Sequence, residues 1–143
     1  AAWRSVLANL EYTLPFLGEG GVHLPYPPDA TVRSRPGGWA YPDMLEVGNL
    51  ANATEDRSHF GAWAIMSSPL ILSFNLSDPA RMARAWPIVT NRAVLGVNQR
   101  WAGSPGRRVS LDVASGREEG LALMELPQPF STATDSPQTS MIL

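Results

Sequence analysis

Two apolar segments separated by one helical pattern constrain the fold of this chain most. Residues 39–47 are short, partly apolar and bounded by glycines, and residues 69–74 form a compact apolar run. Between them, Phe60 and Trp63 belong to an apolar stripe with helical spacing. A strand, a helix and a second strand in this order are typical of a parallel sheet with a crossover helix. The pattern therefore predicts an α/β fold.

Further helical patterns flank this unit. The spacing of apolar residues predicts a helix over residues 3–14, which Pro15 ends because it has no N–H to donate. A second helix is predicted to open at Pro79 and to end before Pro87. Residues 91–97 are predicted to be a short helical or extended piece. The candidate N-caps are Thr54, Ser77 and Asp78.

A different pattern begins after Gln99. Residues 109–113 alternate like a half-buried strand, and residues 121–126 are a second candidate strand. The tail over 127–138 is rich in Pro, Ser and Thr, and we expect it to be poorly ordered. We therefore predict two units, residues 1–98 and residues 99–143.

The start of the chain favours the interpretation that it is a piece of a longer protein. It has no initiator Met and no signal peptide, and it opens inside a helical pattern. A long loop rich in Pro and Gly follows over residues 18–38, and loops of this length in compact domains are usually functional or disordered.

Composition excludes several classes of protein. The 143 residues carry a net charge of −2, whereas nucleic-acid-binding domains are usually basic. No apolar run approaches the ~18 residues of a membrane helix. The chain has no Cys, which excludes a disulfide scaffold, a thiolate zinc site and a cysteine nucleophile.

Polar residues follow both predicted strands, where parallel α/β folds bind ligands. Those after the first strand are Asp43, Met44, Glu46 and Asn49; those after the second are Ser73, Asn75 and Asp78. Asp43 lies between apolar neighbours, so its carboxylate must be paired, and it either contacts a ligand or ties down loop backbone. Glu46 is a candidate acid/base partner, although a solvated or loop-binding glutamate is the favoured interpretation.

The remaining candidates give weaker signals. His23 and His59 are distant from each other and do not form a metal-ligand pattern, so no metal or cofactor is expected. The serines lack the context of a nucleophile elbow. Trp39 and Trp63 could stack on a sugar, but Trp63 is predicted to lie in the core. The sequons at Asn52 and Asn75 favour a secretory-pathway protein.

Three blocks of the chain resemble glycoside hydrolase family 27, which contains the α-galactosidases and α-N-acetylgalactosaminidases. Residues 36–49 read P-G-G-W-A-Y-P-D-M-L-E-V-G-N, where the family has P-G-G-W-N-D-P-D-M-L-x-x-G-N. The similarity continues through residues 57–72 and 91–99, in the family's order and spacing. A weaker match covers residues 3–17.

The resemblance implies the C-terminal part of a (β/α)8 TIM barrel followed by the start of an antiparallel β domain. Residues 39–45 would be barrel strand seven, residues 55–67 its helix, and residues 69–73 strand eight. Asp43 and Met44 match family residues that line the galactose pocket, and Trp39 matches the strand-seven Trp near it.

The resemblance also implies a retaining hydrolysis of terminal α-D-galactosides by two Asp residues, a nucleophile and an acid/base. Neither catalytic context occurs in these residues, so we expect the piece alone to be inactive. Two strands out of eight cannot close a barrel and leave edges and apolar faces exposed, so we also expect the piece alone to aggregate or be molten. The expected partner is an α-galactoside of an oligosaccharide or glycoconjugate, with a homodimer as candidate assembly and no nucleic acid or membrane. The expected location is secreted, lysosomal or vacuolar.

Two alternatives stay open. The family's Asn-Asp before the Pro is replaced by Ala40-Tyr41, which favours a non-catalytic, sugar-binding pseudoenzyme of the same fold. The other alternative is an incomplete gene product that forms no stable protein.

Overall fold

The computed structural model describes residues 2–17, 34–112, 121–125 and 140–142. Its elements, in chain order, are α1 (Trp3–Leu17), α2 (Ala53–Ile65), α3 (Pro79–Val89), α4 (Arg92–Gln99), β1 (Arg107–Asp112), β2 (Leu121–Glu125) and β3 (Ser140–Ile142). The predicted long loop lies mostly outside these residues, and the predicted poorly ordered tail lies wholly outside them.

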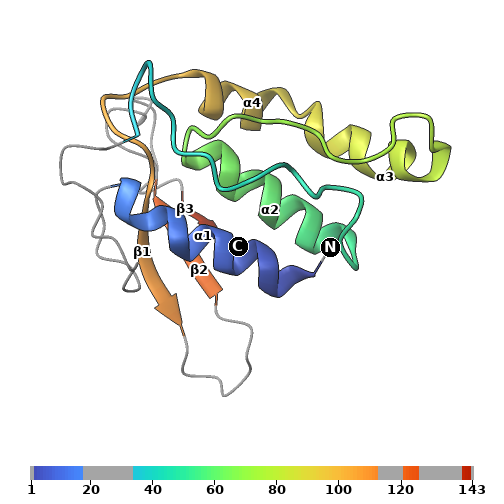
Figure 1. Cartoon of the computed structure of the whole chain (residues 1–143), viewed down its shortest axis with the longest axis horizontal. Helices are drawn as coiled ribbons and strands as arrows, with labels where there is room; N and C mark the ends of the chain where they lie inside the picture. The colour runs from blue at the N-terminus through green and yellow to red at the C-terminus, as the bar shows by residue number, and fades with distance from the viewer. Residues whose placement is uncertain (1, 18–33, 113–120, 126–139, 143) are drawn as a thin grey trace.

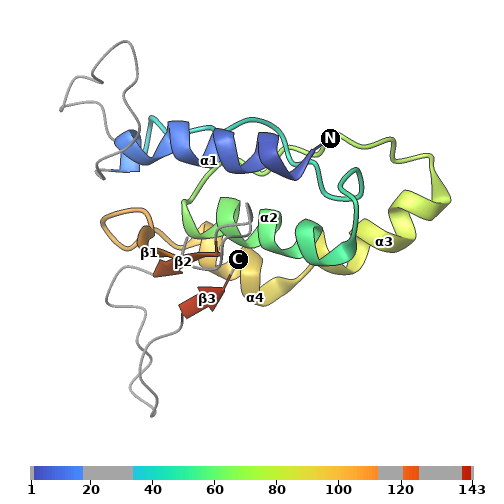
Figure 2. The ribbon, with the colours of Figure 1, turned by 90° about the horizontal axis from the view of Figure 1, so that it is seen from below.

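Helix α2 occupies the centre of the molecule. Figures 1 and 2 show α1 on one side of it and α4 on the other, with α3 beside one end. Two extended segments, residues 39–47 and 69–74, run across another face of α2 at the level of α1 (Figure 2). Almost every residue of the second half of α2 is buried as a result, as expected for a helix covered on several sides.

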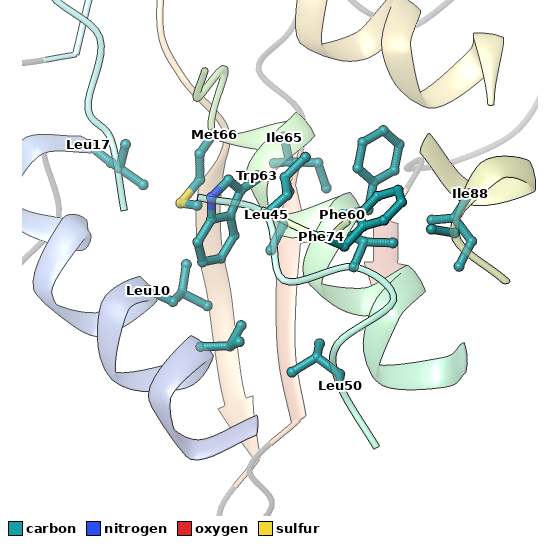
Figure 3. Packing of buried hydrophobic residues seen from close by; sticks show 14 of the residues in the cluster. Leu10, Leu17, Leu45, Leu50, Phe60, Trp63, Ile65, Met66, Phe74 and Ile88 are labelled. Atoms are coloured by element: carbon teal, nitrogen blue, oxygen red, sulfur yellow. The ribbon is translucent and has the colours of Figure 1, made fainter. Parts of the chain in front are cut away.

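The core is built around Trp63, which is fully buried, as predicted. Figure 3 shows its indole close to Met66 of the α2 C-cap, with Leu10 of α1 facing it and Leu45 of the first extended segment beside it. Phe60, Phe74 and Ile88 form the part of the core nearer α3 (Figure 3).

The two predicted strands of the α/β unit are present only as one parallel bridge, between Leu45 and Leu72. The Leu45 amide donates to the Ile71 carbonyl at 2.8 Å, and the Ser73 amide donates to the Leu45 carbonyl at 3.2 Å. The direction is that of a strand–helix–strand unit, but the prediction of full strands is wrong. One reason is that the Asp43 carbonyl, which a longer ladder would pair with the Ile71 amide, accepts from Trp63 of α2 instead.

Two predicted helix ends are also wrong. Helix α1 continues through Pro15 to Leu17, and α3 continues through Pro87 to Val89. Each proline disturbs only the last turn, where Leu17 and Ile88 are buried in the core. Packing of these side chains outweighs the missing N–H.

Caps set the helix starts. Asn52, rather than Thr54, caps α2, because its side-chain oxygen accepts from the amides of Thr54 and Glu55. Asp78 caps α3 with Pro79 in the first turn, which confirms one of the two predicted caps. Residues 92–99 are helical and Asn91 caps them.

Beyond α4 the three strands form an antiparallel sheet in the order β1-β2-β3. In the register of the sheet, Arg107 lies opposite Glu125 and Leu123 lies opposite Ile142. The register shifts at a bulge between Arg108 and Ser110 of β1. The Gly106 amide donates to the Ile65 carbonyl, which ties the start of the sheet to the end of α2. A unit boundary after residue 98 would fall one residue before the end of α4, and its placement stays a prediction.

Candidate functional site

The paired ends of the two extended segments carry a cluster of polar side chains. The Asn49 amide nitrogen donates to Glu46 Oε2 at 2.8 Å and to Ser73 Oγ at 3.4 Å, and Ser73 Oγ donates to the Leu45 carbonyl at 2.7 Å. The sequence placed these residues after two separate strands, and the structure brings them together. Arg81 of α3 joins the cluster through Asn49 Oδ1. No pattern in the sequence singled out Arg81.

Two of the predicted polar residues serve local structure instead. Asn75 Oδ1 accepts from the Ser77 amide at 3.0 Å, and Asp78 Oδ1 accepts from the first amides of α3. Asp78 also pairs with Arg81 at 3.3 Å, which is a pair within the first turn of α3. Neither residue contacts the Glu46–Asn49–Ser73 cluster through a side-chain hydrogen bond in the described part of the chain.

Asp43 is exposed to solvent, so the expectation of an apolar setting that forces its carboxylate into a pair is wrong. Within the part of the chain that the structure describes, its Oδ1 accepts only from the amide of the next residue, Met44, at 2.8 Å. Its backbone has φ of +91°, in a region that residues other than glycine rarely adopt. Such conformations persist only where surrounding structure holds them, and they concentrate at binding and catalytic sites.

Met44 and Trp39, the other two predicted substrate contacts, are also exposed. Met44 is 43% exposed and Trp39 is 39% exposed, so both side chains are accessible to a ligand. The indole of Trp39 packs edge to face on Trp101, with ring centroids 5.1 Å apart and planes at 72°. Trp101 follows α4, and nothing in its spacing from Trp39 could have revealed this contact.

A cavity of about 670 Å³ opens beside these residues, between α1 and the segment 38–43. Trp39 and Asp43 line it, whereas Met44 does not. Tyr41 also lines the cavity. Two effects raise the pKa of its phenol: desolvation is the larger, and the negative charge of Asp43 is the smaller. The phenol therefore stays protonated and can donate a hydrogen bond. The volume lies within the range of small-molecule sites, about 300–1,000 Å³.

The segment 43–48 is held from behind by three buried side chains of α2. Trp63 Nε1 donates to the Asp43 carbonyl at 2.8 Å, and His59 Nε2 accepts from the Glu46 amide at 2.8 Å. Asp56 Oδ1 accepts from the Gly48 amide at 2.9 Å. The three residues are separated by three and four positions, which places them on one face of the helix.

His59 must be neutral to make its contact. Since Nε2 accepts, Nδ1 carries the proton. Nδ1 is buried, and no atom of the described residues accepts a hydrogen bond from it. Burial lowers the pKa of His59 from 6.5 to about 4. Its ring also packs edge to face on the indole of Trp63, with ring centroids 4.1 Å apart. A charged form would lose the contact with the Glu46 amide.

Asp56 extends this anchoring to α3. It is completely buried, and its Oδ2 lies 2.6 Å from Arg84 Nε. Arg84 donates in addition to the Leu50 carbonyl at 2.7 Å. One ion pair thus connects α2, α3 and the loop that follows the site.

The residues that the structure describes, 2–17, 34–112, 121–125 and 140–142, lack two features. They contain no group of three or more His, Asp or Glu placed to hold a metal ion. None of their helices has the length and apolarity needed to cross a membrane.

The sequence model of the family described as Alpha galactosidase A matches residues 28–100, just over half of the chain. The chain belongs to the α-galactosidase family of glycoside hydrolases. The resemblance read from the three sequence blocks is thereby confirmed.

Individual relatives agree with this assignment. Alpha-galactosidase 3 of Arabidopsis thaliana is 39% identical over 75 residues, which are 52% of this chain and 17% of that protein. The alpha-N-acetylgalactosaminidase of Gallus gallus is 32% identical over 95% of this chain and 32% of that protein. The structure of the alpha-galactosidase of Saccharomyces cerevisiae matches with a TM-score of 0.65 at 27% identity, over 85% of this chain and 25% of that chain. This chain therefore spans about a third or less of the length of these relatives.

Proposed function

We propose that this chain is the C-terminal part of the catalytic unit of a retaining glycosidase that hydrolyses terminal α-D-galactosides. Membership of the family supports this proposal, since the relatives described above carry the names of α-galactosidases and of an α-N-acetylgalactosaminidase. A matching structure of the Saccharomyces cerevisiae enzyme is described as being with raffinose.

One observation carries the assignment of the site. Asp43 presents an exposed carboxylate from a left-handed backbone that buried side chains hold in place. In this proposal Asp43 accepts hydrogen bonds from sugar hydroxyls, and Met44 offers an apolar surface to the ring. Trp39, fixed by Trp101, supplies an aromatic face beside the cavity.

The catalytic pair of the proposed reaction lies outside these residues. The family's nucleophile stands in a Lys-Tyr/Phe-Asp context, and this chain has no lysine. A retaining mechanism needs two carboxyl groups about 5–5.5 Å apart across the glycosidic bond. The chain supplies binding residues for one side of the sugar, while the rest of the barrel supplies the chemistry.

Hydrolysis of a chromogenic α-galactoside tests the proposal. The purified 143-residue chain and the full-length gene product that carries it are assayed in parallel, together with Asp43→Asn and the control Asp78→Asn in the full-length protein. Asparagine at position 78 can still cap α3, and Asp78 does not line the cavity. We expect no activity from the chain, activity from the full-length protein, and a raised KM for Asp43→Asn only. Activity of the isolated chain would show that the catalytic carboxylates are placed wrongly here.

A non-catalytic sugar-binding protein is the second candidate, because Ala40-Tyr41 replaces two polar residues of the family. Tyr41 is exposed in the cavity wall, where its neutral phenol can contact a ligand. Titration calorimetry of the full-length protein with galactose distinguishes the two candidates. Binding without turnover would favour the pseudoenzyme.

A further inference from the structure

Helix α2 contacts residues 43–48, the segment to which we assign sugar binding, through three side chains, Asp56, His59 and Trp63. We call these three side chains the α2 ladder and each of them a rung. We propose that the α2 ladder is the positioning device of the site: it sets the backbone of residues 43–48 so that Asp43 and Met44 face the sugar. This inference rests on the proposed function for its consequence, but the ladder itself is a property of the fold.

The first rung holds a disfavoured conformation. Asp43 has φ of +91°, and a non-glycine residue leaves that region unless its surroundings fix it. Trp63 Nε1 donates to the carbonyl of this residue at 2.8 Å. The indole is completely buried among core side chains (Figure 3), so it cannot follow the backbone if the peptide turns. The bond therefore acts against relaxation of Asp43 to an ordinary extended conformation.

The second rung sets the residues that follow. His59 accepts from the Glu46 amide at 2.8 Å from a ring that is 1% exposed. Leu45 between the two rungs is fully buried and also pairs with Ile71 and Ser73. With Asp43 before it and Glu46 after it bonded to α2, Leu45 anchors the segment to the core, and the side chain of Met44 is left on the exposed side.

The third rung closes the segment. Asp56 Oδ1 accepts from the Gly48 amide, while Oδ2 pairs with Arg84. Gly48 has φ of +86°, so the chain turns here, and the buried carboxylate fixes where the turn occurs. Both ends of the segment are thus bonded to one rigid helix.

The exposed side of the segment has much weaker restraints. The carboxylate of Asp43 bonds only to the neighbouring amide of Met44 among the described residues. The position of the sugar-facing groups therefore depends on the backbone, and the backbone depends on the α2 ladder. Site geometry has to be held within about 0.5 Å for full function, which a solvated segment without anchors would not achieve.

The test uses four variants of the full-length protein. Trp63→Phe removes the N–H together with the five-membered ring, and Trp86→Phe makes the same substitution on α3 at a side chain that is 52% exposed. His59→Leu removes the acceptor, and His59→Gln restores one at the same position, so this pair separates the hydrogen bond from packing. Each variant is measured for kcat and KM on an α-galactoside, for galactose affinity, and for hydrogen exchange of the amides of residues 43–48 and of α3.

We expect Trp63→Phe and His59→Leu to speed exchange of residues 43–48 without changing that of α3, and to lower kcat/KM by about 10²-fold. Trp86→Phe should match the wild type, and His59→Gln should recover most of the loss seen in His59→Leu. If Trp63→Phe does not fold, the comparison of the two His59 variants decides the matter.

Unchanged exchange in residues 43–48 would overturn the inference, and so would faster exchange with unchanged sugar affinity and kcat/KM, since the ladder would then only stabilise the fold. A wild type that neither binds nor hydrolyses galactosides would refute the proposed function instead. In that case the exchange measurement still decides whether the rungs hold the segment.

Discussion

Acid should destabilise this fold through one histidine. His59 is buried, and its pKa of about 4 lies well below the 6.5 of the unfolded chain. As pH falls from 6.5 to 4, His59 binds a proton in the unfolded chain but stays neutral in the folded protein. The free energy of unfolding therefore falls by about 1.4 kcal/mol for each pH unit in this window. Across the window the loss is about 3 kcal/mol, a large share of the total stability of a typical domain.

The perturbation that isolates this contribution is His59→Gln. Glutamine keeps an oxygen that can accept from the Glu46 amide, but it does not titrate. Denaturant unfolding of the full-length wild type and variant at several pH values between 7.5 and 4 gives the comparison. Carboxylate titration is common to both proteins and cancels in the difference.

We expect the variant to gain on the wild type by about 3 kcal/mol between pH 7 and pH 4, with the change complete near pH 4. Parallel pH profiles would refute the reasoning. They would mean that the folded protein protonates His59 as readily as the unfolded chain does, so that the histidine is not held neutral by the core.

Three further predictions concern stability in denaturant titrations. Asp56→Ala leaves its arginine partner and a buried amide without a carboxylate, and it should cost about 3–5 kcal/mol. Gly48→Ala should destabilise, because φ is +86° and the new Cβ would lie 3.3 Å from that of Ala85. Gly96→Ala in α4 is its control: it meets nothing within 4 Å and should stabilise by about 0.5–1 kcal/mol. Leu45→Ala removes a fully buried side chain and should cost about 2–5 kcal/mol; a smaller loss would show that the Leu45–Leu72 bridge is not part of the core.

Much of the fold could be predicted from local patterns. The order of helices and extended segments follows from apolar spacing, and the cap at Asp78 follows from the affinity of a carboxylate for free amides. Helix ends at Pro15 and Pro87 could not be predicted correctly, because burial of residues beyond each proline decides them. The sequence shows the proline but not the packing that compensates for it.

The sequence singled out candidate site residues but not the contacts that hold them. The use of Asp43 and Met44 by a sugar stays a prediction, and the strand on which they were expected is reduced to the Leu45–Leu72 bridge. The spacing of His59 from other candidate ligands indicated no metal site, but it could not indicate what the ring does contact. Its actual partner, the amide of Glu46, is a backbone group thirteen residues away and carries no sequence signal. Arg81 was missed for a related reason, since its contact depends on how α3 packs.

The three rungs of the α2 ladder also impose a counting rule on the chain. The first and third rungs are five residues apart in the segment, at Asp43 and Gly48, and seven residues apart in the helix, at Trp63 and Asp56. Seven helical residues span about 10 Å along the axis, and the segment runs in the opposite direction. One residue added or removed between the first and third rungs would put every later amide out of reach of its partner. The turn that follows Gly48 is constrained as well, because Asn52 caps α2 and the Ala51 amide donates to Glu55 Oε2. Substitutions of many side chains around this site are therefore compatible with the fold, whereas the number of residues between Asp43 and Gly48 has to stay the same.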